Sequence, residues 1–276
     1  MKMEPAEKFV DIESVIGKKN PRLLRLIPGF VIRYLKHIVH QDGLNQIIEN
    51  GKNLDGVAFV RSALSDLGTK FTSVGAENIP SSGRFIFAAN HPLGGLDGMV
   101  LIDEIGKFFP DVKFIVNDLL LNIKNLEPVF IPVNKHGRQT AEYASKIDMA
   151  YASDTQILYF PAGLCSRKIS GKIVDLDWHK SFINKAVKYQ RDIIPVYFDG
   201  RNTKFFYNLA RIRNFLGIKA NIEMLYLVDE MYKQRNNKIR VVFGKPISFK
   251  TFDKSKSPLD WANYVREHVY ALTNKL

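Results

Sequence analysis

Short apolar segments alternate with helix-length amphipathic segments from about residue 75 onward. Strands that alternate with helices in this way predict an α/β domain, with a mainly parallel sheet flanked by helices. The predicted strands are 84–89, 112–116, 129–133, 156–160, 193–198 and 240–243. The clearest predicted helices are 98–107, 138–152, 178–189 and 257–274.

The sequence before residue 69 is predicted to be helical. Asn20-Pro21 provides an N-cap followed by proline at the first helical position, and apolar residues recur at helical spacing from there to about His40. Further helices are expected at 43–50 and 55–67, followed by a short strand at 70–74. These patterns divide the chain into an N-terminal helical region, 1–68, and an α/β domain, 69–276.

Cationic and bulky apolar residues are mixed along the predicted 20–40 helix, as in the Leu23, Ile27 and Phe30 set interleaved with arginines. This mixture is typical of a helix that lies in a lipid interface, but a helix packed on the domain with a solvated basic face would show it as well. We expect the N-terminal extension to associate with a membrane. A second basic and apolar stretch, 201–219, either extends that membrane face or packs against the domain.

Composition narrows the class of protein. With 46% hydrophobic residues in 276, the chain can bury a full core, which excludes disorder and fibrous repeats. Cys165 is the only cysteine, so an internal disulfide is impossible and a reducing compartment is favoured. No apolar run approaches the roughly 18–20 residues that span a bilayer, and no export signal is expected in residues 1–20. The net charge of +12 leaves nucleic acid, an anionic lipid surface or an acidic protein open as partners.

The densest candidate chemistry follows the predicted strand 84–89. The segment Asn90-His91-Pro-Leu-Gly94-Gly95-Leu-Asp97 places a histidine and a carboxylate on either side of a glycine-rich turn. Ligands of α/β sheets bind at the carboxyl ends of strands, so His91 lies where a catalytic base is expected. A phosphate cradle or a purely structural turn are the alternatives, but neither GxxxxGK[ST] nor GxGxxG occurs. The six histidines show no HExxH spacing, so we expect no metal site.

Polar turns or strand ends recur at three other predicted strands. They are Asn134-Lys135-His136-Gly137-Arg138, Phe160-Pro161-Ala162-Gly163-Leu164-Cys165-Ser166-Arg167-Lys168, and Ile193-Ile194-Pro195-Val196-Tyr197. The carboxyl ends of parallel strands meet at one edge of a sheet. Four such segments in one chain therefore favour a shared active-site face over four independent loops.

The order of these segments resembles the motif blocks of the lysophospholipid acyltransferase superfamily, over roughly residues 75–250. His91 and Asp97 resemble the catalytic His-x4-Asp block, 130–135 the second block, 160–163 the third, which is usually FPEG, and 194–196 the fourth. Here five residues separate His91 from Asp97, and Ala replaces the usual Glu of the third block. Cysteine also stands where the family has a phosphate-contacting arginine, so the nearest guanidinium is displaced by two residues.

These variants resemble the hemolysin-like branch, whose members include bacterial acyltransferases that make ornithine and glycine aminolipids. The resemblance implies an O-acyltransferase that moves a fatty acyl group from an acyl thioester to the hydroxyl of a lyso-lipid, with a monoacylated amino-acid lipid as the expected acceptor. The alternatives are a 1-acylglycerol-3-phosphate acyltransferase of phospholipid synthesis and a catalytically degenerate lipid-binding homologue. Nucleic-acid binding is disfavoured because the aromatic residues fall within apolar periodic runs.

The same resemblance implies roles for individual residues. His91 would be the general base and Asp97 would orient it. Cys165 is an alternative nucleophile, although an inert thiol is expected because the family uses none. Backbone N–H groups at Gly94, Gly95 or Gly163 would stabilise the oxyanion. The residues expected to bind substrate are Asn134, Lys135, Arg138, Gly163, Ser166 and Arg167.

The expected partners follow from this assignment and from the basic surface. The co-substrate would be a thioester of acyl carrier protein or coenzyme A, and no other cofactor is expected. The second substrate would be the lyso-lipid acceptor. An anionic membrane surface would hold the chain peripherally at the cytoplasmic face of the inner membrane.

Overall fold

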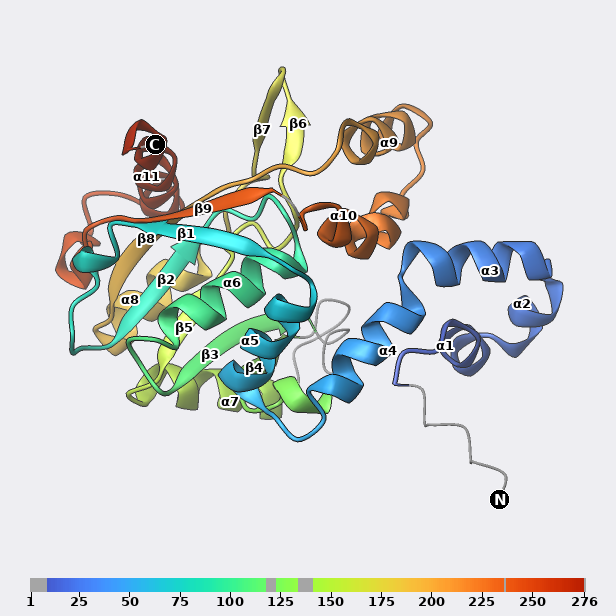
Figure 1. Cartoon of the computed structure of the whole chain (residues 1–276). Coiled ribbons are helices and arrows are strands. Elements are labelled where there is room, and N and C mark those ends of the chain that lie inside the picture. Colours follow the sequence, from blue (N-terminus) through green and yellow to red (C-terminus); the bar gives the residue numbers. More distant parts are fainter. Residues whose placement is uncertain (1–8, 118–122, 134–140, 236, 276) are drawn as a thin grey trace.

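A seven-stranded sheet forms the centre of the structure (Figure 1), a computed structural model that describes residues 9–117, 123–133, 141–235 and 237–275. Its strand order is β1-β9-β8-β2-β5-β3-β4. The strands are β1 (Lys70–Val74), β2 (Phe85–Ala89), β3 (Val112–Asn117), β4 (Phe130–Val133), β5 (Gln156–Tyr159), β8 (Asp192–Asp199) and β9 (Lys238–Phe243). Every neighbouring pair is parallel except β8 and β9. The predicted mainly parallel sheet is confirmed.

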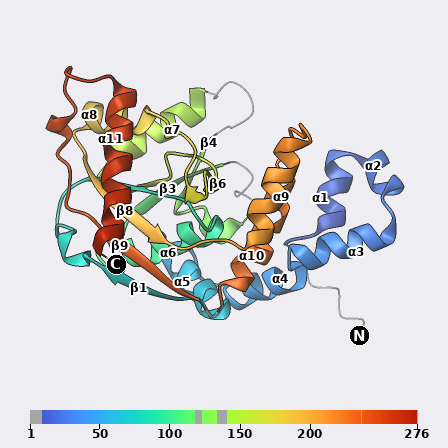
Figure 2. The same ribbon diagram turned by 90° about the horizontal axis from the view of Figure 1, so that it is seen from above.

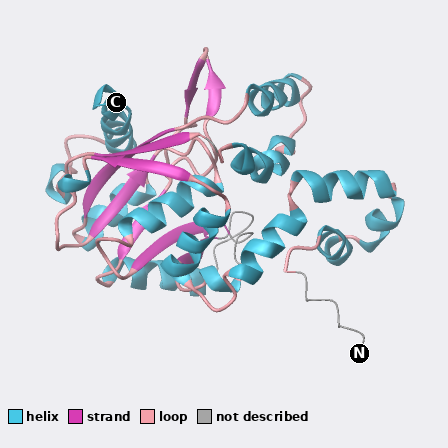
Figure 3. Ribbon diagram, in the orientation of Figure 1, coloured by secondary structure: helices cyan, strands magenta, loops and turns pink. Residues whose placement is uncertain are grey.

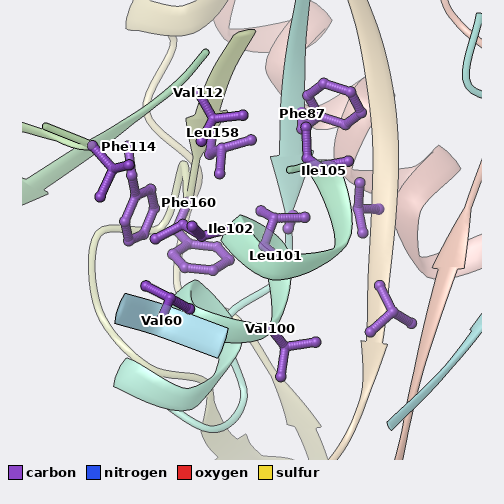
Figure 4. Close-up of a cluster of buried hydrophobic side chains, with 14 of the residues drawn as sticks. Val60, Phe87, Val100, Leu101, Ile102, Ile105, Val112, Phe114, Leu158 and Phe160 are labelled. Atoms are coloured by element: carbon purple, nitrogen blue, oxygen red, sulfur yellow. The ribbon is translucent and has the colours of Figure 1, made fainter. Parts of the chain in front are cut away.

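Helices cover both faces of the sheet (Figures 1 and 3). The elements α5 (Gly56–Asp66) and α6 (Gly95–Ile105) pack on one face, and α7 (Ala141–Ala152), α8 (Ser181–Tyr189) and α11 (Pro258–Ala271) pack on the other. Alternate side chains of β2 point to opposite faces of the sheet. Phe87 packs in the hydrophobic cluster under α5 and α6, whereas Ile86 and Ala88 pack in the cluster under α7, α8 and α11. Because β2 is buried on both faces, it is apolar throughout. Figure 4 shows Leu101 and Ile102 of α6 within the first of these cores.

The described part of the N-terminal region, 9–68, contains α5 and four helices before it: α1 (Ile12–Lys19), α2 (Pro21–Leu26), α3 (Gly29–Ile38) and α4 (Gln41–Asn50). The single helix predicted over 20–40 is wrong. It begins as expected, with the Asn20 side chain accepting a hydrogen bond from the Leu23 N–H at 3.0 Å. It then breaks at Ile27, whose backbone is extended before Pro28, because a proline ring disfavours helical backbone in the preceding residue.

The boundary predicted at residue 68 stays a prediction. Helices on its N-terminal side contribute Ile48, Phe59, Val60 and Leu64 to the same buried cluster as β2 and α6. Within the described residues, no helix combines the length and apolarity needed to cross a membrane.

Among the described residues, five helices and strands lie outside the ranges predicted above. They are α1, the two strands of an antiparallel hairpin, β6 (Arg167–Ile169) and β7 (Lys172–Val174), and the helices α9 (Lys204–Phe215) and α10 (Leu227–Lys233). Short 3-10 turns complete the described chain: η1 (Ala76–Asn78), η3 (Lys124–Leu126), η4 (Ile222–Tyr226), η5 (Phe249–Thr251) and η6 (Leu272–Lys275). The other predicted strands and helices are confirmed within a few residues of their ends, although 138–140 lie outside the described residues.

One buried cation ties the strands on either side of β2 together. Arg191, which precedes β8, is fully buried, and its guanidinium donates to the carbonyl oxygens of Tyr151, Thr155 and Phe85 at 2.7, 2.7 and 3.4 Å. It also donates to two further carbonyls at the end of α7. Burial, followed by the nearby charge of Arg84, lowers the pKa of Arg191 to about 10, so it remains a cation at neutral pH. The start of β8 is thereby fixed against the start of β5.

We predict that Arg191→Met lowers the free energy of unfolding strongly, because it leaves several buried carbonyl groups without donors. Each unsatisfied buried group costs about 1–3 kcal/mol, so a total loss of about 3 kcal/mol or more is expected. Urea unfolding followed by circular dichroism measures it. The exposed Lys250→Met is the matched control and should change stability by less than about 0.5 kcal/mol. Equal stability of the two variants would contradict the structural role of Arg191.

Candidate active site

Parallel pairing brings three of the four predicted polar segments to one edge of the sheet. Ala88 of β2 is paired with Tyr159 of β5 and with Pro195 of β8, so the carboxyl ends of these three strands lie side by side. The turns after residues 89, 159 and 199 therefore meet there. The fourth segment, which contains Asn134, Lys135 and Arg138, lies outside the described residues.

Asn90 explains why the chain turns immediately after β2. Its amide donates to the Phe198 carbonyl at 3.0 Å and accepts from the Phe198 N–H at 2.6 Å. The side chain thus takes the place of a backbone partner and extends the pairing of β2 with β8. The Asn90 side chain is buried and satisfied, while the backbone that follows is released into the turn.

His91 and Asp97 face each other across this turn. The Nδ1 atom of His91 lies 3.1 Å from Oδ2 of Asp97, which is in the first turn of α6 and fully buried. The same Oδ2 accepts the N–H groups of Leu93 and Gly94 at 2.7 and 3.1 Å. Gly94 adopts a φ of +79°, a conformation that favours glycine. This glycine lets the longer His-x5-Asp segment close on itself.

The His91 ring is held in a largely apolar slot. It stacks on Phe160, with ring centroids 4.0 Å apart and an interplanar angle of 17°, and only 16% of its side chain is exposed. Burial alone would lower its pKa. The side chain of Cys165 and the carboxylate of Asp97 outweigh burial and raise the pKa of His91 to about 10.

Burial raises the pKa of Asp97, opposed by its bond to His91 and by backbone N–H groups. His91 and Asp97 therefore form a coupled pair that retains a proton at Nδ1. Once neutral, such an imidazole can accept a proton at Nε2. The arrangement is that of a general base with an orienting carboxylate.

A second buried carboxylate, Asp175, supports the turn from the other side. Its Oδ1 accepts the His91 backbone N–H at 3.1 Å and the Ser166 hydroxyl at 2.6 Å, and its Oδ2 accepts Nε1 of Trp178 at 2.9 Å. Asp175 is 1% exposed. It acts through the backbone and is a positioning residue, which sequence reasoning missed because a single aspartate after a short strand carries no motif.

Ser166 lies within this network. Its hydroxyl is committed to Asp175, and its N–H donates to the His91 carbonyl at 2.8 Å. The residue is 1% exposed, yet it reaches the wall of the cavity described below. Its predicted role in substrate binding stays a prediction, while its observed contacts hold the His91 turn in place.

Arg167 points into the protein. Its guanidinium donates to Glu223 at 2.9 Å and to the Cys165 carbonyl at 2.7 Å, and its side chain is 10% exposed. Glu223 also pairs with Arg213 at 2.8 Å. In this arrangement the buried Glu223 is already paired with the Arg167 guanidinium. The predicted part of Arg167 in substrate binding stays a prediction.

The glycines expected to form an oxyanion hole differ in their surroundings. The Gly94 N–H is bonded to Asp97 and is not available to an oxyanion. Gly163 is exposed, with a φ of +63°, and its N–H donates to the Phe160 carbonyl at 3.0 Å. Its predicted part in substrate binding stays a prediction. In the described part of the chain, no group of three or more metal-binding side chains is present.

A cavity of about 990 Å³ adjoins the His91 turn, and we call it the β8 cavity. Asn90, Pro92 and Ser166 line it on the side of the turn. The segment 197–204, at the carboxyl end of β8, and the first residues of β9 line much of the remainder. The cavity and the His91 pair therefore share one stretch of backbone.

Comparison with known proteins supports one family. The sequence model of the Acyltransferase family matches residues 14–276. Two proteins named lyso-glycine lipid O-acyltransferase, from Bacteroides thetaiotaomicron and Phocaeicola vulgatus, are 46% and 47% identical to this chain over 265 residues. The alignments cover 96% of this chain and 97% and 95% of the relatives.

Among solved structures, the 1-acyl-sn-glycerophosphate acyltransferase PlsC from Thermotoga maritima is 19% identical, with a TM-score of 0.45 and coverage of 94% of this chain and 91% of that one. The family match spans nearly the whole chain. The chain belongs to the acyltransferase family, within the lysophospholipid acyltransferase superfamily, and is an acyltransferase enzyme.

Proposed function

We propose that this enzyme transfers a fatty acyl group from an acyl thioester to the hydroxyl of a monoacylated amino-acid lipid of the glycine-lipid type. The observation that carries the proposal is the contact between His91 and the buried Asp97 at the carboxyl end of β2. The names of the two relatives support the acceptor class. The acceptor hydroxyl would be the 3-hydroxyl of its amide-linked acyl chain.

The chemistry needs no enzyme nucleophile. Neutral His91 takes the proton of the acceptor hydroxyl at Nε2 while the hydroxyl oxygen attacks the thioester carbonyl carbon. The tetrahedral intermediate then collapses, the carbon–sulfur bond breaks, and the imidazolium returns the proton to the leaving thiolate. Throughout these steps His91 keeps its proton at Nδ1 and donates a hydrogen bond from it to the Asp97 carboxylate, which stabilises the imidazolium.

Two observations favour this reaction over the alternatives. An intact His91 and Asp97 pair with a packed ring argues against a degenerate homologue. The pairing of Arg167 with Glu223 argues against a phosphomonoester acceptor, because a dianion would need cations that a buried glutamate does not already neutralise.

The donor would be a thioester of acyl carrier protein or of coenzyme A. The net charge of +12 suits either one, since acyl carrier protein is acidic and coenzyme A carries phosphates. No other cofactor enters the proposed reaction.

We further propose that the enzyme docks peripherally on an anionic membrane, at the cytoplasmic face of the inner membrane. Large apolar side chains are exposed on two segments that lie on the same side of the molecule in Figures 1 and 2, the N-terminal helices and α9. They are Leu23, Leu26, Phe30 and Tyr34 on the first and Phe205, Ile212 and Phe215 on the second, with Leu216 just beyond its end. The Tyr34 and Tyr226 hydroxyls, 2.8 Å apart, join the first segment to η4, and Tyr226 packs against Phe205.

The acceptor is tested by competition between lyso-glycine lipid and lysophosphatidic acid. With the purified enzyme and one common acyl thioester, we predict that kcat/KM is more than tenfold higher for lyso-glycine lipid, about 1.4 kcal/mol of transition-state preference. His91→Ala should abolish transfer to both acceptors, which controls for background reaction. A preference of tenfold or more for lysophosphatidic acid would assign the enzyme to phospholipid synthesis.

The raised pKa of His91 predicts a pH dependence. Only neutral imidazole accepts a proton, so kcat/KM should rise with pH and keep rising well above the usual histidine pKa of about 6.5. Asp97→Asn removes one of the charges that stabilise the imidazolium. In this variant the rising limb of the kcat/KM profile should therefore move to lower pH, while the kcat/KM plateau at high pH falls by about 10²–10⁴-fold.

Cys165→Ala is the matched control for this profile. Cys165 also raises the pKa of His91, so its removal should shift the limb in the same direction as Asp97→Asn. It should do so without the loss of plateau, because Cys165 takes no part in the proposed chemistry. A comparable fall in the plateau would instead indicate that the thiol is needed for transfer.

Membrane docking is tested by flotation with vesicles of phosphatidylcholine and phosphatidylglycerol. Burying a leucine or phenylalanine side chain is worth about 1.5–3 kcal/mol. The double variants Leu26→Glu/Phe30→Glu and Ile212→Glu/Phe215→Glu should each lower the bound fraction severely. Val187→Glu/Leu259→Glu, on α8 and α11, removes two other exposed apolar groups and should bind as the wild type does. Equal loss in all three would show that general surface charge governs binding.

A further inference from the structure

The β8 cavity contains a polar atom that lacks a partner. Asn202 is 4% exposed and lines the cavity, and its Oδ1 has no hydrogen bond within the described residues. The orientation of the amide is fixed, because Nδ2 donates to the Pro92 carbonyl at 3.2 Å. Oδ1 is therefore a buried acceptor. A buried acceptor without a donor is costly, so it is best explained by a donor that a ligand brings.

The cavity is also strongly cationic. Among the described residues that line it are Lys168, Arg201, Lys204, Lys233 and Lys238 but only one carboxylate, Asp199. Asp199 already pairs with Arg240, and Lys233 pairs with Asp229. Among the residues that the structure describes, the other four cations have no ion-pair partner. Such a site binds a ligand with negative charge.

A ligand for this cavity must therefore carry an anionic group and, close to it, an N–H or O–H donor for Asn202. An N-acylated amino acid has this pattern, because its amide N–H is separated from its carboxylate by a single carbon. A free phosphate satisfies the cations but does not reliably supply a donor to Oδ1. The phosphopantetheine arm of the donor also combines an anion with donors, but its phosphate lies further from its amide groups.

We propose that the β8 cavity binds the N-acyl amino-acid end of the acceptor, with the carboxylate on Arg201 and Lys204 and the amide N–H on Oδ1 of Asn202. The assignment rests on the proposed function. The Asn202 amide holds the carbonyl of Pro92, the residue next to His91, so head-group binding and the catalytic turn are linked by one hydrogen bond. The reacting 3-hydroxyl lies only a few bonds from the amide. A head group in this cavity thus keeps the hydroxyl near the His91 turn.

Calorimetry with short soluble ligands tests the Asn202 contact without altering the protein. The ligands are N-hexanoylglycine, N-hexanoylsarcosine, which lacks the N–H, and N-hexanoylglycinamide, which lacks the carboxylate charge. We expect N-hexanoylglycine to bind to the full chain at least tenfold more tightly than either analogue. Equal binding of the glycine and sarcosine ligands would overturn the role of Asn202.

Charge variants test the cations. The double variant Arg201→Gln/Lys204→Gln should bind N-hexanoylglycine at least tenfold more weakly than the wild type. Its KM for lyso-glycine lipid should rise to a similar extent, and its KM for the acyl donor should not change. Lys250→Gln/Lys254→Gln, an equal loss of exposed charge elsewhere, should alter neither. If the cation variant instead binds phosphopantetheine more weakly and has a higher KM for the acyl donor, the cavity binds the donor and the proposal is wrong.

The two proposals fail in different ways. If the wild-type enzyme acylates lyso-glycine lipid but the cavity variants leave its KM unchanged, the acceptor assignment holds and the cavity assignment does not. If the wild-type enzyme does not acylate this lipid at all while N-hexanoylglycine still binds as expected, the proposed function is wrong although the cavity recognises the head group.

Discussion

The active-site edge depends on one carboxylate oxygen. Oδ2 of Asp97 contacts Nδ1 of His91 and accepts the N–H groups of Leu93 and Gly94, at the start of α6. An isolated buried carboxylate is very unfavourable, and only a close set of donors offsets the loss of water. The turn must therefore close around Asp97 whenever α6 packs on β2. The geometry of His91 is in this way a consequence of core packing.

Two further buried carboxylates join segments that are separate in the sequence. Asp175 joins the end of β7 to the His91 turn, and Glu223 joins Arg167 of β6 to Arg213 of α9. The ion pairs of Glu223 contribute little net stability relative to apolar packing, but removing one partner leaves an uncompensated charge. They favour one arrangement over its alternatives, which suits a site whose walls come from a hairpin and two irregular segments.

Local pattern was sufficient for the sheet, the main helices and the position of His91 at a strand end, because periodicity and strand-end turns are local properties. The pairing of His91 with Asp97 was expected only from the resemblance to the acyltransferase motif. The break at Pro28 also had a local signal, and so did the β6–β7 hairpin, whose Ser170 and Gly171 have positive φ as a tight two-residue turn requires. The contacts between Arg167 and Glu223 and between Asn202 and Pro92 had none. They join residues 56 and 110 positions apart, and only the assembled fold brings such groups together.

The pairing of β1 with β9 has a consequence for biosynthesis. Lys70 of β1 is in register with Lys238 of β9, and the same end of β9 supplies Lys238 and Ile239 to the wall of the β8 cavity. Contacts between residues so far apart in sequence form late and slowly. During translation the N-terminal helices and the His91 turn emerge well before β9 does. A nascent chain thus presents its exposed apolar N-terminal helices before its cavity wall is complete, and β9 joins β1 to the rest of the sheet and completes the cavity wall in one step.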